Sequence, residues 1–154
     1  MLLICGRGSL EKSLSALAGE LGIADRVKFL GLRSDIPDVM NAADGFVMSS
    51  YLEGLPMVLL QAASVGLPIV ATDVGGNAEV VIHGVNGFVV PPGSDEALAN
   101  GMKSVLRLPE AERHLMAERG RLLAREKFEI ERILDRWEAL YCQQIEGKTG
   151  HRIR

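Results

Sequence analysis

The residues best suited to chemistry stand just before and at the start of a predicted helix. Pro56, at the expected first helical position, has no amide hydrogen, so the amides of Met57 and Val58 remain as unpaired donors along the helix axis. Such a helix start attracts an anion, and a diphosphate suits it. Gly54 lets a ligand approach the backbone closely. Glu53 would repel a phosphate, so hydrogen bonds from sugar hydroxyls are the natural use of its carboxylate.

Gln61 follows in the sixth position of this predicted helix. Helical side chains lean toward the helix N-terminus, so Gln61 is expected to reach toward a ribose placed above the helix start. The alternative is purely structural: Glu53 as a helix-start charge and Gln61 as a neutral residue on a packed helix. The residues alone leave both interpretations open.

Two glycine clusters follow predicted strands. Gly75-Gly76 needs special backbone angles, and Gly76 or Asn77 is expected to cap the next helix, although a plain turn is the alternative. The cluster at Gly6 and Gly8 lacks the third glycine of a dinucleotide fingerprint. It also has no acidic residue at the end of a second strand about 20 positions on, because Val27 opens that strand, and this argues against a nicotinamide cofactor.

Other chemistries find no support. The histidines are scattered, no Asp-x-Asp pair exists to hold a metal on a diphosphate, and no serine lies in a Gly-x-Ser-x-Gly elbow, so we expect neither metal nor cofactor. The basic residues near the C-terminus are interleaved with acidic ones, which is typical of a solvated helix face and argues against a nucleic-acid partner: Arg119, Arg121, Arg125 and Arg132 lie among Glu118, Glu126, Glu129 and Glu131.

Length and composition indicate one globular domain, or one half of a two-domain protein. The chain has 154 residues, 47% hydrophobic and 24% charged, with a net charge of -3. Residues 1–100 are acidic, with 5 Lys and Arg against 11 Asp and Glu, whereas residues 101–154 carry 12 against 9. The two cysteines make no disulfide framework. No signal peptide is expected, and prolines interrupt the only long uncharged stretch, so we expect no membrane span.

Apolar runs and helical periodicity alternate along the chain, which predicts a parallel sheet covered by helices on both faces. The loops 6–9, 31–35, 49–55 and 73–77 are expected to line one edge, where such sheets bind ligands. We expect one domain over residues 1–145 and a flexible tail over 146–154. The predicted strands are 2–5, 27–31, 45–49, 68–72 and 87–90, and the predicted helices are 10–21, 36–43, 56–65, 94–107, 110–126 and 129–144.

A series of motifs, specific in its order and spacing, resembles the C-terminal half of glycosyltransferase family 4, the group 1 glycosyltransferases. The motifs are Gly6-x-Gly8, Asp25-Arg26-Val27-Lys28-Phe29-Leu30-Gly31, Ala42-Ala43-Asp44, Ser49-x-x-x-Glu53-Gly54-Leu55-Pro56, Gly66-x-Pro68 through Gly75-Gly76-x-x-Glu79, and Gly84-x-Asn86-Gly87. The resemblance implies a Rossmann-like parallel sheet, the C-terminal half of a GT-B architecture. It also implies metal-free, retaining transfer from a UDP-, GDP- or ADP-sugar.

The resemblance assigns roles to individual residues. Glu53 matches the first Glu of the family's paired motif, which contacts the donor sugar. The amides of Leu55, Met57 and Val58 match those that hold sugar and diphosphate beside Gly54. Near the base, the matching residues are Gly31, Leu32 and Arg33.

The chain departs from the family in two ways. Gln61 replaces the second Glu, which accepts hydrogen bonds from the ribose, so we expect weaker nucleotide binding. In the family, a central strand followed by an Arg and a Lys precedes the strand that matches residues 2–5, and an N-terminal domain binds the acceptor. Without these parts we expect open sheet edges and a chain that is inactive alone, whether it is truncated or completed by a partner.

We therefore interpret the chain as the donor-binding half of a glycosyltransferase. The expected acceptor is a saccharide or lipid-linked saccharide of an envelope or capsule polysaccharide. The expected place of action is the cytoplasm, with only peripheral contact at the inner face of the membrane. The alternative is a nucleotide-binding module that has lost transferase activity. A related GT-B epimerase fits less well, because the motif Ser49-x-x-x-Glu53-Gly54-Leu55-Pro56 resembles that of the transferases.

Overall fold

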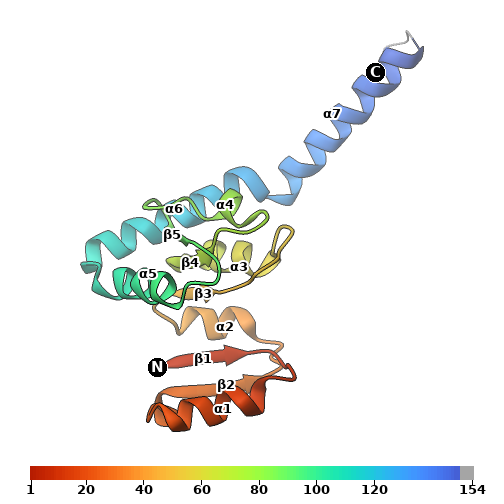
Figure 1. Ribbon diagram of the computed structural model, residues 1–154. Coiled ribbons are helices and arrows are strands. Elements are labelled where there is room, and N and C mark those ends of the chain that lie inside the picture. The colour runs from red at the N-terminus through yellow and green to blue at the C-terminus, as the bar shows by residue number, and fades with distance from the viewer. Residues whose placement is uncertain (150–154) are drawn as a thin grey trace. The chain divides into compact units, whose positions relative to one another are not determined.

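The computed structural model describes residues 1–149 as an α/β protein with parallel strands and covering helices, as predicted (Figure 1). The chain divides into two compact units, Met1–Asp38 and the part that begins at Val39.

The first unit holds two parallel strands and one main helix. Strand β1 (Leu2–Cys5) pairs with β2 (Val27–Gly31), with Leu2 opposite Val27. Helix α1 (Glu11–Glu20) and the 3₁₀ turn η1 (Ala24–Arg26) connect them. The expected burial of β1 is wrong: Leu2 and Leu3 are 41% and 36% exposed. A two-stranded sheet with one helix has too few neighbours to cover both faces.

Helix α2 (Ile36–Asn41) spans the boundary of the units and is shorter than predicted. Just before it, the Asp35 carboxylate accepts hydrogen bonds from the Arg33 guanidinium, and the Asp35 backbone oxygen accepts from the Asp38 amide at 3.0 Å.

The second unit is built on a three-stranded parallel sheet in the order β3-β4-β5. The strands are β3 (Phe46–Met48), β4 (Ile69–Thr72) and β5 (Gly87–Val90). Every residue of the central strand β4 is buried. The predicted strand positions are thus confirmed to within a residue.

Helices cover both faces of this sheet. On one face, Val105 of α5 (Asp95–Arg107) packs with Val70 and Val90. Alternate residues of β4 face the opposite side, where α3 (Met57–Val65) contributes the fully buried Leu59. Helix α6 (Glu110–Phe128) packs against α3, so each face of β4 is shielded from water.

The five strands form two parallel sheets, β1-β2 in the first unit and β3-β4-β5 in the second. Parallel sheets flanked by helices are the predicted α/β class, and the sheet of the second unit is covered on both faces.

The C-terminal helix is longer than predicted. Helix α7 runs over Ile130–Thr149, past the expected end at 144 and into the expected tail. The rest of that tail, residues 150–154, lies outside the described residues. No helix among the described residues is long and apolar enough to cross a membrane.

Candidate functional site

In the second unit, two loops meet at the carboxyl ends of β3 and β4. The first leads from Met48 through Glu53 into α3, and the second leads from Thr72 into the short helix α4 (Asn77–Val80). The Gly76 amide donates to the Gly54 carbonyl at 2.6 Å, so the loops are joined directly. They are two of the four loops expected along one edge.

The start of α3 differs from the prediction by one residue. Pro56 is the N-cap, with extended angles (φ -74°, ψ 118°), and Met57 is the first helical residue. The Leu59 amide bonds the Pro56 carbonyl at 3.1 Å. The amides of Met57 and Val58 have no partner within residues 1–149, as the argument for an anion site requires. Proline ends the loop because its extended conformation and missing donor suit an N-cap.

The Glu53 carboxylate is held by a neighbouring side chain. Ser50 Oγ donates to Glu53 Oε1 at 2.7 Å, and Thr72 Oγ1 donates to the Ser50 carbonyl at 2.6 Å. Thr72 is 3% exposed at the end of the buried strand β4. Its own carbonyl accepts from Asn77 Nδ2 at 2.9 Å. These bonds link the Glu53 loop to the interior of the unit.

The Gly75-Gly76 pair is required by close packing rather than by the turn alone. Gly75 has φ +51°, and a Cβ there would lie 1.8 Å from the Glu53 carbonyl oxygen. A Cβ on Gly76 would lie 2.6 Å from the Gly54 carbonyl oxygen. Only glycine allows the two loops to approach this closely. Gly76 is also the N-cap of α4, as one of the predicted alternatives had it.

The remaining predicted residues of this unit lie on the accessible surface around the helix start. Leu55 and Met57 are 43% and 66% exposed, and Gln61 is exposed on the second turn of α3. Glu53 and Val58 are half-buried. The structure therefore brings Glu53, Gly54, Leu55, Met57, Val58 and Gln61 together along one loop and one helix start.

The three predicted base-side residues belong to the first unit. Gly31 ends β2 with φ +63°, and its carbonyl accepts from the Gly6 amide at 2.7 Å. Leu32 is 69% exposed. The Arg33 guanidinium forms an ion pair with Asp35. Hydrogen bonds from Arg33 hold the pKa of the Asp35 carboxyl below its usual range, and the same contact raises the pKa of Arg33.

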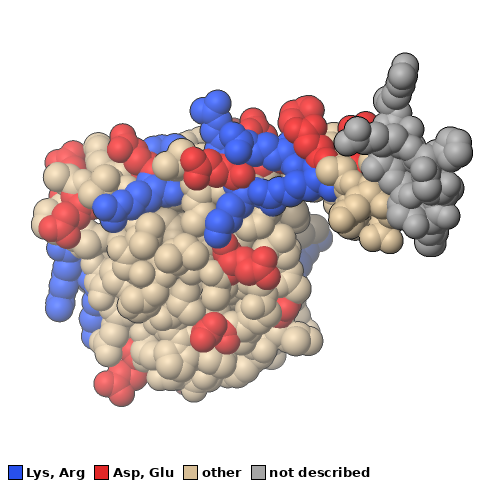
Figure 2. Space-filling model, turned by 90° about the horizontal axis from the view of Figure 1, so that it is seen from above, with Lys and Arg blue, Asp and Glu red and all other residues tan. Residues whose placement is uncertain are grey.

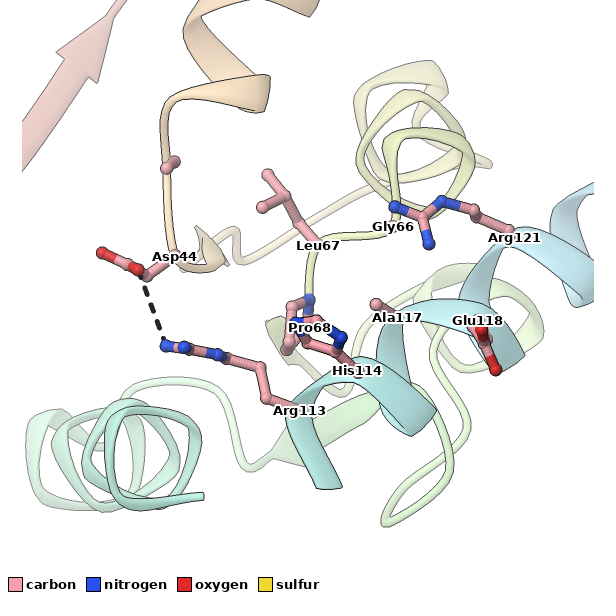
Figure 3. A pocket seen from close by; sticks show the side chains of 10 residues that line it. Asp44, Gly66, Leu67, Pro68, Arg113, His114, Ala117, Glu118 and Arg121 are labelled. Carbon is pink, nitrogen blue, oxygen red and sulfur yellow. Dashed lines mark ion pairs between the residues drawn. The ribbon is translucent and has the colours of Figure 1, made fainter. Parts of the chain in front are cut away.

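A separate cavity of about 300 Å³ lies at the opposite end of the second unit's sheet, between α6 and the loop before β4 (Figure 3). Arg113 approaches Asp44 at 3.6 Å. Arg121 donates to the Val65 carbonyl at the end of α3, and a Cβ on Gly66 would lie 2.3 Å from its Cζ. The packing of α6 on α3 accounts for these contacts, and both arginines already have partners.

The charges of α6 fit the predicted solvated face. Its first turn is acidic, with Glu110 and Glu112, and its last turn is basic, with Arg125 and Lys127, which complements the helix dipole. Figure 2 shows Lys and Arg side chains interleaved with Asp and Glu on this side of the molecule. No group of His, Cys, Asp and Glu among the described residues could hold a metal ion.

Residues 1–123 match the family model described as "Glycosyl transferases group 1". The chain belongs to this family. The chain is 33% identical to the N-acetyl-alpha-D-glucosaminyl L-malate synthase of Bacillus anthracis over 152 residues, which are 99% of the chain and 40% of that glycosyltransferase relative. It thus spans about two fifths of the length of this relative.

Solved structures of similar proteins agree with the fold. The Anabaena protein Alr3699/HepE in complex with UDP matches with a TM-score of 0.82 at 32% identity, over 90% of this chain and 40% of that one. Its complex with UDP-glucose matches at 0.80 and 33%, with the same coverage. Sucrose-phosphate synthase from Thermosynechococcus elongatus matches at 0.83 and 29%, over 95% and 39%. These neighbours are GT-B glycosyltransferases, which confirms the predicted architecture.

Sequence reasoning missed Ser50 and Thr72. The motif drew attention to Ser49, but Ser50 is the serine that bonds the Glu53 carboxylate. Its spacing of three residues from Glu53 was a usable signal, because serine hydroxyls often bond groups a few residues away along a turn. Thr72 carried no such signal, since it is 22 residues from Ser50 in the chain.

Proposed function

We propose that this chain is the donor-binding part of a group 1 glycosyltransferase that uses a nucleotide-diphosphate sugar. The observation that carries the proposal is the likeness to HepE, which binds UDP and UDP-glucose and matches 90% of this chain. The unpaired amides at the start of α3 and the tethered carboxylate of Glu53 support it from this chain's own residues.

In the proposed site, the amides of Leu55, Met57 and Val58 hold the diphosphate and the sugar, and Glu53 accepts hydrogen bonds from sugar hydroxyls. Gln61 takes the place beside the ribose. No metal or other cofactor takes part. The helix start would favour the diphosphate because partial positive charge gathers there.

We propose transfer with retention of configuration. The acceptor hydroxyl attacks the anomeric carbon from the face that the diphosphate leaves, the carbon–diphosphate bond breaks, and the hydroxyl proton passes to the leaving phosphate. Stabilising that leaving group is the main electrostatic task. The amides of α3 supply part of it. In the whole protein, further basic residues and an acceptor-binding domain are expected to complete the reaction.

The proposed acceptor is a saccharide or a lipid-linked saccharide of an envelope polysaccharide, and the proposed place is the cytoplasm, at most peripherally against the membrane. Several relatives support this choice by name, among them the lipopolysaccharide core biosynthesis glycosyltransferase LpsE of Rhizobium meliloti, 33% identical over 96% of this chain and 42% of LpsE.

The decisive test measures the binding of UDP, GDP and ADP to the 154-residue chain. Heat unfolding and calorimetry are the two methods. Binding raises the unfolding temperature only for a folded site, and the preferred nucleotide names the base. Met57→Pro removes one amide without disturbing the helix, because proline suits the first helical position and Pro56 is already extended. Its nucleotide affinity is expected to fall by about tenfold.

Met57→Ala is the matched control, since it shortens the same exposed side chain but keeps the amide. If both variants bind the nucleotide as the unchanged chain does, the diphosphate does not lie at the start of α3. If no nucleotide binds a cooperatively folded chain, the proposed function is wrong.

The second candidate is a module that has lost transferase activity, which Gln61 favours because the family's acidic residue is missing there. Nucleotide binding is then retained without sugar transfer. Transfer of labelled glucose from UDP-glucose, assayed with the acceptor-binding part present, separates the two candidates.

A further inference from the structure

We propose that Ser50 is a positioning residue for the Glu53 carboxylate and that Thr72 anchors Ser50 to the sheet. Together they orient Glu53 toward the sugar of a nucleotide-sugar. This inference rests on the proposed function and adds to it the residues that prepare the sugar subsite before the ligand arrives.

A hydrogen bond from Ser50 restrains the Glu53 side chain. Glu53 is only half-buried, so by itself its flexible side chain would sample several rotamers and lose that freedom on binding a sugar. Ser50 Oγ removes much of it by donating to Oε1 at 2.7 Å. Oε2 has no hydrogen-bond partner within residues 1–149 and is left to accept from a ligand.

Thr72 in turn holds the backbone of Ser50. The Ser50 carbonyl accepts from Thr72 Oγ1 at 2.6 Å, and the buried Asn77 amide group donates to the Thr72 carbonyl at 2.9 Å. Thr72 ends a strand in which every residue is buried. The serine therefore does not move freely with the loop, and its hydroxyl is presented from a fixed backbone.

The Gly75-Gly76 turn fixes the main chain of Glu53. Gly76 donates to the Gly54 carbonyl, and the Gly75 Cα lies so close to the Glu53 carbonyl that no side chain fits between them. The main chain of Glu53 is thus fixed by the Gly75-Gly76 turn, and the carboxylate is fixed by Ser50. Such preorganisation lowers the entropic cost of binding the sugar.

Ser50 is expected to affect the binding of the sugar but not of the nucleotide. We would measure the dissociation constants of UDP and UDP-glucose for the 154-residue chain and for Ser50→Ala. The variant is expected to bind UDP-glucose about fivefold more weakly and to bind UDP unchanged, because one hydrogen bond to the carboxylate is lost. Ser50→Thr keeps a hydroxyl and is expected to restore part of the sugar-dependent affinity.

Ser49→Ala is the matched control, because Ser49 is the exposed neighbour and makes no hydrogen bond among the described residues. Equal weakening of UDP and UDP-glucose by Ser50→Ala, or no weakening of either, would overturn the positioning role. If the unchanged chain binds neither UDP nor UDP-glucose, the proposed function is wrong, and the affinities of the variants then say nothing about Ser50.

Crystal structures of the unchanged chain, Ser50→Ala and Ser49→Ala then judge the tether by itself. A Glu53 carboxylate ordered in the unchanged chain and in Ser49→Ala but disordered in Ser50→Ala supports positioning. An equally ordered carboxylate in all three overturns it.

Discussion

At the scale of single residues, Gln61 is the position where the resemblance predicts an acidic residue and this chain has an amide. An amide oxygen accepts a hydrogen bond from a ribose hydroxyl, but without the strength that a carboxylate adds. Gln61→Glu is therefore expected to tighten UDP binding by about fivefold, equivalent to about 1 kcal/mol. Calorimetric titration with UDP measures the change.

The control for this substitution is Gln143→Glu, which adds the same charge to an exposed position of α7. An affinity that Gln61→Glu leaves unchanged, or weakens through repulsion of the diphosphate, would mean that the ribose does not lie above α3. Equal tightening by both variants would point to net charge rather than to a local hydrogen bond.

Local features could be predicted where they depend on neighbouring residues. The unpaired amides at the start of α3 follow from Pro56 and the residues after it, so the sequence predicted them, although Pro56 is the N-cap rather than the first helical residue. The support of Glu53 was not predictable in the same way. Thr72 reaches Ser50 only because β3 and β4 are neighbours in the sheet. A single sequence does not show which strands pair or in which register.

At the scale of elements, the two loops at the end of the sheet depend on Gly75. Gly75→Ala would place a methyl group 1.8 Å from a backbone oxygen in a left-handed conformation. We expect it to lower the free energy of unfolding by about 3 kcal/mol or more, since the left-handed conformation and the overlap both cost stability. Urea unfolding of the second unit measures the loss.

Gly84→Ala is the matched control, because Gly84 also has a left-handed backbone (φ +74°) but open space where its Cβ would lie. Its cost is expected to be about 1 kcal/mol, from conformation alone. If the two variants lose the same stability, the loops are not held at the observed distance, and the backbone support of Glu53 is absent in solution.

The positions of the elements were predicted well because strongly apolar runs and helical periodicity dictate them. Burial was predicted for the central strand β4 but not for α1. Its leucines recur at helical spacing, yet Leu14 and Leu17 are 43% and 47% exposed and only Ala18 is buried. Periodicity identifies which face of a helix is apolar, whereas the amount of that face that is covered depends on what packs against it.

At the scale of the whole molecule, helix α7 carries an exposed apolar stripe. Its surface residues repeat at helical spacing and are each about half exposed: Ile130, Leu134, Trp137, Leu140 and Tyr141. The sequence predicted the helix but not the exposure of this stripe. Residue Trp137 is 51% exposed, and its ring packs only partly on Tyr141, with ring centroids 5.6 Å apart.

Trp137 is the only tryptophan, so its fluorescence reports on α7 without interference. Because half of its surface meets water, we expect native emission close to that of N-acetyltryptophanamide, efficient quenching by acrylamide, and little change in emission wavelength on unfolding in urea. A blue-shifted emission that acrylamide barely quenches would contradict the exposure of α7. In that case, measurements at lower protein concentration show what buries Trp137. A shift back to the emission of exposed tryptophan means that another copy of the chain had packed against α7. An unchanged spectrum means that other residues of the same chain pack against α7.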